Sequence, residues 1–165
     1  MADFIAVNST ANFANLVLNA DGVNYSSNVD VAFEGAGAAN AMPVPALQEI
    51  TVNATPGTFN WQQLDELSEK VVTTPSTNSI SVTLVLDPVT FFTGQANTDG
   101  IFDIVNNKTE TYFRLYWQGS GTGDRYIQGK GYLSALAPTV SPGSPVWTSP
   151  LEILVTGSYE SKTKD

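Results

Sequence analysis

The residues that could carry chemistry are few, because this chain of 165 residues contains no His and no Cys. Without an imidazole, neither a Ser-His-Asp nor a Cys-His arrangement can be built. The common zinc sites need Cys or His ligands and are excluded as well. Any proton transfer would fall to Asp, Glu, Lys or Tyr. These residue types therefore exclude imidazole-based and thiol-based catalysis and the common zinc sites.

The carboxylates that remain form no pattern typical of a site. Asp65, Glu66 and Glu69 are the densest group, and a carboxylate pair could serve a glycosidase. Two adjacent acids with a third one turn later are more typical of a solvated face. Residues 95–100 resemble the middle of a calcium loop, but Gln95 stands at the first ligand position, where a carboxylate is needed. Neither group predicts a catalytic or metal centre.

Two further patterns have both a binding and a structural interpretation. The glycine-rich residues 119–124 could cradle phosphate only ahead of a helix, and predicted strands lie on both sides, which favours a hairpin turn. A set of aromatic side chains could form a platform for sugars or bases, or could simply pack within and across strands. These aromatic residues are Tyr112, Tyr116, Trp117, Tyr126 and Tyr132.

Charge is low and unevenly distributed. Charged residues make up 14% of the chain, below the usual quarter, and the formal net charge is −9. The first 69 residues hold eight acids and no base, whereas the remaining 96 hold eight acids and seven bases. This pattern lacks the basic stripe of a nucleic-acid groove. It suggests a surface that repels polyanions, or a solubility charge that happens to cluster.

Neither end of the chain nor its interior predicts membrane insertion. No apolar run approaches the roughly 20 residues of a membrane-spanning helix. The first residues lack the basic and apolar regions of a secretory signal, and we expect none.

The elements that position these residues are mostly strands. Alternation is clearest in residues 79–87, where every second residue from 80 to 86 is apolar. In residues 112–118 the alternation sets Phe113 and Leu115 on one face and Arg114 on the other. Further strands are predicted at residues 126–136 and 151–159, and shorter ones at 29–34 and 49–53.

One helix, two long loops and a tail complete the prediction. Asp99 is placed to cap a helix over residues 100–106, with an uncertain first turn near residues 88–94. Residues 35–46 are small, apolar and uncharged, which suggests packing on a partner chain or a mobile linker. Residues 137–150 contain four prolines and predict a stiff connection.

Residues 1–160 are expected to form one domain, and residues 161–165 a frayed tail. Within the domain, residues 61–71 are ambiguous. Trp61, Leu64, Leu67 and Val71 fit a helical stripe, but the residues that follow favour a strand.

The order of these elements resembles the major tail tube protein of long-tailed, siphophage-type bacteriophages. The resemblance covers about residues 53–159 and rests on order and periodicity, without a catalytic signature. The segments that carry it are residues 79–87, the helix before Lys108, and residues 111–117, 129–136 and 151–157.

This resemblance implies an all-β fold with one flanking α-helix, as a β-sandwich or partial barrel. It implies a structural virion protein in the phage tail, made in the host cytoplasm. We expect this protein not to be an enzyme and to bind neither a cofactor nor a metal ion. Copies would form rings, expected to be hexameric, that stack into a tube for genome delivery. The expected partners are further copies and the tape measure, tail tip and tail terminator proteins. Phage DNA would pass through without specific binding, and no membrane would be involved.

Four acids on the polar faces of predicted strands are the candidates for the channel lining. They are Asp30, Glu34, Glu49 and Asp87. The loop at residues 35–46 is expected to contact the next subunit or ring, helped by residues 137–150 and 2–10. Its candidate contact residues are Gly35, Ala36, Gly37, Ala38, Met42, Pro43, Val44 and Pro45.

A second interpretation stays open at this point. A monomeric carbohydrate-binding or adhesion β-sandwich could use the Tyr and Trp side chains as a platform. A subunit of a contractile-tail tube or of a secretion-system tube is a close variant of the first interpretation, and the sequence does not separate them.

Overall fold

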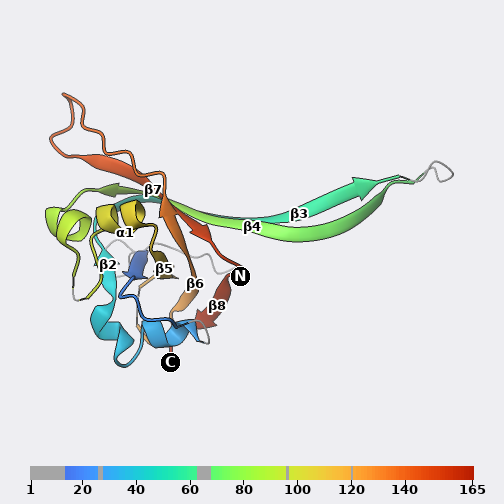
Figure 1. Cartoon of the computed structure of the whole chain (residues 1–165), viewed down its shortest axis with the longest axis horizontal. Helices are drawn as coiled ribbons and strands as arrows, with labels where there is room; N and C mark the ends of the chain where they lie inside the picture. Colours follow the sequence, from blue (N-terminus) through green and yellow to red (C-terminus); the bar gives the residue numbers. More distant parts are fainter. Residues whose placement is uncertain (1–13, 26–27, 63–67, 96, 120) are drawn as a thin grey trace, which may run out of the picture.

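Antiparallel strands make up most of the fold, as the sequence predicts (Figure 1). The structure is a computed structural model that describes residues 14–25, 28–62, 68–95, 97–119 and 121–165. Its strands are β1 (Asn15–Asn19), β2 (Met42–Val44), β3 (Leu47–Trp61), β4 (Lys70–Val85), β5 (Glu110–Tyr116), β6 (Arg125–Ser134), β7 (Thr148–Val155) and β8 (Glu160–Thr163). Its helical elements are the 3-10 turns η1 (Val29–Ala32) and η2 (Gly37–Asn40), the π-helical turn η3 (Val89–Thr93) and the helix α1 (Ile101–Asn107).

The strands form one sheet that wraps around the main apolar core. The strand order is β2-β1-β5-β6-β7-β4-β3, and β8 pairs with β6 beside this path. Alternate side chains of the strands fill the core, and η3 and α1 pack against it through Phe91, Ile101 and Ile104. The strand residues at its centre include Leu16, Leu18, Met42, Ile80, Phe113, Leu115, Leu151 and Ile153. The expected all-β architecture with one flanking α-helix is confirmed.

The four longest predicted strands are present and overlap β4, β5, β6 and β7, each of which ends two to four residues earlier than predicted. The register that sets Tyr116 opposite Tyr126 confirms the hairpin between β5 and β6. Gly131 in β6 marks a close approach of two backbones, because a Cβ there would lie 2.1 Å from the carbonyl oxygen of Leu154 in β7.

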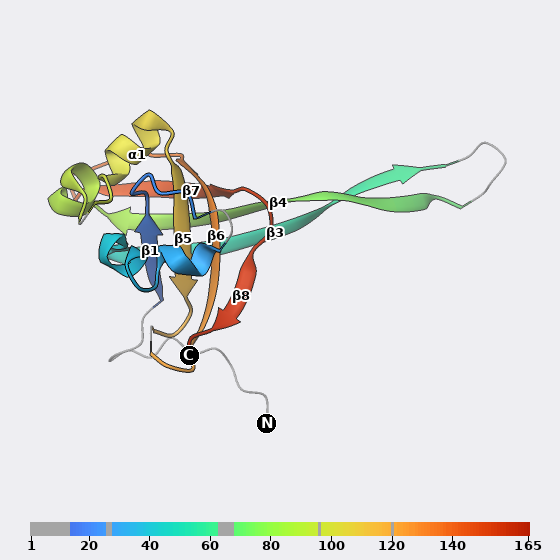
Figure 2. The same ribbon diagram turned by 60° about the horizontal axis from the view of Figure 1, so that its bottom comes forward.

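The largest departure from the prediction is the length of β3 and β4. Together they leave the body of the molecule as a long, twisted two-stranded hairpin (Figures 1 and 2). β7 pairs with β4 only at β4 residues 78–85, so residues 70–77 of β4 have only β3 beside them. We call residues 54–61 and 70–77 the arm. Trp61 and Val71 of the ambiguous stripe lie in the arm strands, whereas Leu64 and Leu67 fall outside the described residues.

Three local predictions are wrong. Residues 29–32 form η1 instead of a strand, because the Asn28 side chain accepts a hydrogen bond from the Asp30 backbone at 3.0 Å and caps the turn. Residues 160–163 pair with β6 as β8, where the prediction has a frayed tail from residue 161 onward. The helix α1 is present, but its N-cap is Gly100, without a side-chain cap from Asp99.

Candidate assembly surfaces

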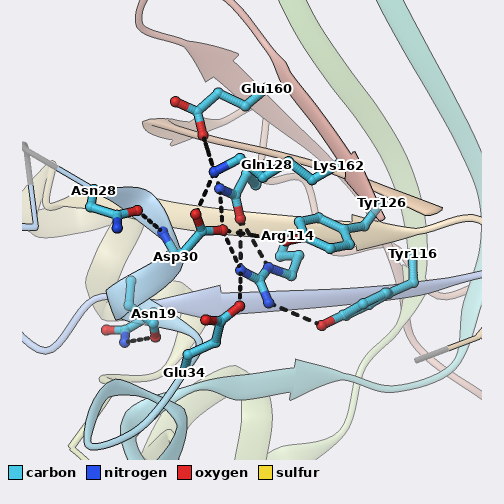
Figure 3. Close-up of polar contacts among 11 residues, drawn as sticks. Asn19, Asn28, Asp30, Glu34, Arg114, Tyr116, Tyr126, Gln128, Glu160 and Lys162 are labelled. Atoms are coloured by element: carbon cyan, nitrogen blue, oxygen red, sulfur yellow. Dashed lines mark hydrogen bonds and ion pairs between the residues drawn. The ribbon is translucent and has the colours of Figure 1, made fainter. Parts of the chain in front are cut away.

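The densest polar cluster of the described chain surrounds Arg114 of β5 (Figure 3). The Arg114 side chain is only 1% exposed. Its Nε and Nη2 atoms donate to Oε1 of Gln128 at 3.0 and 2.8 Å. Nη2 also donates to Asp30 at 3.0 Å and to Glu34 at 3.2 Å. A buried guanidinium requires partners of this kind, because an unpaired buried charge is costly.

Aromatic rings and a second cation complete this Arg114 cluster. The guanidinium carbon lies 5.0 Å from the Phe33 ring centre and 4.2 Å from that of Tyr126. Lys162 of β8 forms an ion pair with Asp30 of η1. The outer face of β5, which carries Arg114, is thus covered by η1 and β8 and is not exposed to solvent.

Two pKa shifts in the cluster favour its charged form. Burial raises the pKa of Asp30, but the hydrogen bonds from Lys162 and Gln128 and the charges of Lys162 and Arg114 outweigh burial and leave this pKa below its ordinary value. The hydrogen bond with Asp30 raises the pKa of Lys162. Asp30 and Lys162 are therefore both ionised near neutral pH. Because they pair, they fasten the C-terminal strand β8 to η1.

The structure does not gather the four predicted channel acids on one surface. Asp30 and Glu34 lie close together because both form ion pairs with Arg114. Asp87 follows β4, and its Oδ2 accepts a hydrogen bond from the Thr90 backbone at 2.9 Å, at the start of η3. Glu49 is the member that lies on an exposed strand face.

Glu49 belongs to a polar face of β3, β4 and β7. Directly paired residues of antiparallel strands share a face. The register pairs Glu49 with Thr83, and it pairs Ser81 with both Thr51 and Glu152. A shallow groove of about 250 Å³ crosses this face, and its lining contains both acids and no Lys or Arg. We call these five residues the polar face.

The predicted contact loop, residues 35–46, is partly built into the fold. Met42 is fully buried and Val44 is 3% exposed, and their strand β2 pairs with β1. Gly37 lies against η1, where a Cβ would come within 2.0 Å of the Val31 carbonyl oxygen. Packing within the chain thus accounts for much of the apolar character of this loop. The exposed members of the predicted contact set are Gly35, Ala36, Ala38, Pro43 and Pro45.

The aromatic side chains of β5 and β6 do not form an exposed platform. Tyr112, Tyr116 and Tyr126 are 3%, 6% and 3% exposed, and Trp117 is half-buried. Tyr132 is exposed. Packing is therefore the role of most of this set, and the observation that favoured a sugar-binding surface is lost.

The arm carries an apolar face that the sequence analysis does not identify. Phe59 pairs with Val72, and Trp61 pairs with Lys70, so these four side chains share one face. Phe59 is 58% exposed, Val72 51% and Trp61 37%. Lys70 lies over the Trp61 ring, 5.2 Å from its centre. In the sequence, the feature that could have indicated this face is the presence of aromatic residues among Thr, Pro and Gly. We call Phe59, Trp61 and Val72 the arm face.

A second apolar surface lies between η3, α1 and the proline-rich connection. It is a groove of about 360 Å³. Phe92 is 61% exposed, Trp147 52% and Phe102 46%. The rings of Phe92 and Phe102 lie 6.2 Å apart. The groove is lined by Leu86, Phe91, Phe92, Phe102, Pro138 and Trp147, and we call it the phenylalanine groove.

Other predicted positions carry no site in the described part of the chain. Asp65, Glu66 and residues 2–10 lie outside it. Within the described ranges, no group of three or more His, Cys, Asp or Glu is arranged to hold a metal ion. In the same ranges, no helix is long and apolar enough to cross a membrane.

Comparison with known proteins finds a similar fold in solved structures only. No family model and no curated protein matches the sequence. Solved structures do match. The tail of an empty gene transfer agent (GTA) particle with C6 symmetry aligns with a TM-score of 0.58 at 14% identity, over 79% of this chain and 92% of that one. The SPP1 tail tube aligns with a TM-score of 0.60 at 11% identity, over 92% of this chain and 77% of that one.

A third match comes from the virion of a native gene transfer agent particle, with a TM-score of 0.50 at 11% identity, over 74% of this chain and 89% of that one. At these identities the likeness concerns the fold. The chain therefore has the fold found in the SPP1 tail tube and in the tails of gene transfer agents.

Proposed function

We propose that this chain is the structural subunit of a phage-type tail tube, located in the virion tail. Copies associate side by side into rings, and the rings stack into a hollow tube through which the genome is delivered. The observation that carries this proposal is the fold shared over 92% of the chain with a tail tube. The C6 symmetry of a second match supports rings of six.

The uncovered features of the single chain support self-association. The sheet ends at β3, an edge strand of 15 residues. Unpaired strand edges and exposed apolar faces are liabilities in an isolated protein. Closure of strands around a ring removes such edges. The role that follows is structural and involves no catalysis.

The polar face is our candidate for the channel lining. Neither η1, η2 nor β8 covers it, in contrast to the outer face of β5. The hydroxyl groups of Thr51, Ser81 and Thr83, with the acids Glu49 and Glu152, offer phosphate no cationic partner. Of the acids that the sequence analysis puts forward, Glu49 fits this role. Asp30 and Asp87 already serve contacts within the chain.

Reversing the charge of this face tests the channel assignment. Glu49→Lys with Glu152→Lys is expected to leave tube assembly intact and to slow genome delivery, because lysines would bind passing phosphates. The control is Asp165→Lys, at an exposed position outside the polar face, the arm and the phenylalanine groove. Unchanged infectivity of the double variant, in particles with normal tails, would rule out this lining.

The tube itself is tested by electron microscopy of negatively stained protein across concentration and time, with mass from light scattering. We expect hollow tubes or six-membered rings. A monomer that persists at all concentrations, also when tail tip and tape measure proteins are added as initiators, would contradict the proposal.

A further inference from the structure

The arm and the phenylalanine groove are complementary apolar surfaces, and each lacks a cover within the described chain. An isolated two-stranded hairpin is at best marginally stable in water. The arm face nevertheless presents Phe59, Trp61 and Val72 to solvent. Exposed apolar patches of this kind mark sites of interaction.

The phenylalanine groove is suited to aromatic side chains. All six lining residues are apolar. Phe91 and Phe92 meet edge to face, with ring centres 4.7 Å apart, so the groove wall already has the geometry that aromatic clusters prefer. Gly100 permits the close approach of α1 to η3, because a Cβ there would lie 2.6 Å from the Phe92 carbonyl oxygen.

The two surfaces cannot meet within one copy. Figure 1 shows η3 and α1 at one end of the molecule and the arm projecting from the opposite side. A contact between two different surfaces of one protein is heterologous, and its repetition builds closed rings or open filaments. The geometry of the single chain therefore calls for a second copy.

Charge supports the same pairing. Lys70 is the cation beside the arm face, over the Trp61 ring. The groove is flanked in sequence by Asp87, after Leu86, and by the exposed Asp103, after Phe102. An arm inserted with Trp61 foremost would bring its cation toward these acids.

We infer that the arm face of one copy docks in the phenylalanine groove of a neighbouring copy. This inference rests on the proposed tube and specifies one contact that holds it together. Phe59 and Trp61 are of the aromatic type that withdraws roughly 150–250 Å² each from water on burial.

Two valines of the arm provide a matched test. Val72 lies on the arm face, whereas its neighbour Val71 pairs with Asn60 on the opposite face, and both are exposed, at 51% and 62%. Val72→Ser is expected to raise the protein concentration needed for assembly about ten-fold, the factor that 1.4 kcal/mol of lost contact gives. Val71→Ser is expected to leave it unchanged. Equal effects of the two substitutions, or a larger effect of Val71→Ser, would overturn the inference.

Cross-linking tests the identity of the two surfaces directly, in a chain that has no native Cys. Tubes assembled from a mixture of Val72→Cys and Val146→Cys subunits, the latter beside Trp147 at the groove, are treated with a short bis-maleimide. Cross-linked dimers are expected in the mixture and not in tubes of either variant alone. The control mixture pairs Val72→Cys with Val31→Cys on η1, an exposed position on an element that does not line the groove.

The outcomes separate this inference from the proposed function. Tubes that form without the Val72–Val146 cross-link, or with an equally strong Val72–Val31 cross-link, overturn the docking and leave the tube in place. A failure of the unmodified chain to assemble under any condition overturns both.

Discussion

The body and the arm of this protein differ in how they treat their apolar side chains. In the body, apolar residues are buried in a main core and in a smaller cluster around Phe33 and Tyr112, and even the charged Arg114 is surrounded by hydrogen-bond partners. In the arm, β3 and β4 extend away from the body, where β4 no longer pairs with β7. Aromatic side chains of the arm are exposed to water. The comparison teaches that most of the body buries its own apolar side chains, whereas the arm face and the phenylalanine groove of the body leave theirs exposed.

Removing the arm should give the largest effect of the changes considered. When residues 55–76 are replaced by an Asn-Gly turn, the body is expected to stay folded, since the core contains no arm residue. Assembly is expected to be lost completely. Circular dichroism melting checks the fold and light scattering checks assembly. Tubes formed by the shortened chain would show that the arm is dispensable.

Breaking the Arg114 cluster should do the reverse and affect the body. Arg114→Ala leaves the Asp30 carboxylate facing buried Gln128 without the guanidinium. We expect the free energy of unfolding to fall by about 3–5 kcal/mol. Urea denaturation measures the loss. Arg125→Ala, at an exposed position of β6, is the control and is expected to change stability little. A loss below about 1 kcal/mol would show that the cluster is not needed to hold η1 and β8.

A smaller loss of stability is expected from a substitution at Gly100, between α1 and η3 of the phenylalanine groove. Gly100→Ala places a methyl group against the Phe91 and Phe92 backbones and forces η3 away from α1. Overpacking of this kind costs about 1–3 kcal/mol. Assembly should weaken in addition, because the groove changes shape. Gly143→Ala adds the same methyl group where no atom lies within 4 Å, and it should alter neither property.

The smallest effect concerns pH. The pKa of Asp30 is lower in the folded chain than in the unfolded one, so its contribution to stability is present above the unfolded pKa of about 3.9 and is lost as pH falls through the folded value. Below about pH 4 the native protein should therefore lose stability more steeply than Asp30→Asn. Unfolding curves at several pH values compare the two slopes. Parallel slopes would mean that the ion pair with Lys162 does not stabilise the fold.

The body could be predicted from sequence to the extent that burial leaves a local pattern. Residues 80–86 alternate because β4 buries every second side chain there, and the strand is predicted correctly. The same alternation at residues 29–34 is misleading. Asn28 caps a turn at that point, and Asp30 reaches Arg114, a partner 84 residues away. Contacts at such separations leave no periodic trace in the sequence.

The arm could not be predicted for a related reason. Its apolar side chains are not buried within the copy, so no alternation between core and solvent marks it. Pro56 and Pro75 also argue against strands, because proline interrupts a ladder except on an edge. Both arm strands are edges, and the prolines are tolerated there. The arm face and the phenylalanine groove arise from the tertiary fold, and no sequence motif marks them.

Hydrogen exchange, followed by mass spectrometry on the free chain and on assembled tubes, compares arm and body most directly. We expect amides of the body outside η3 and α1 to be protected in both states. We expect amides of the arm to exchange rapidly in the free chain and to become protected in the tube, together with those of η3 and α1 at the groove. Arm amides that exchange equally fast before and after assembly would contradict this account.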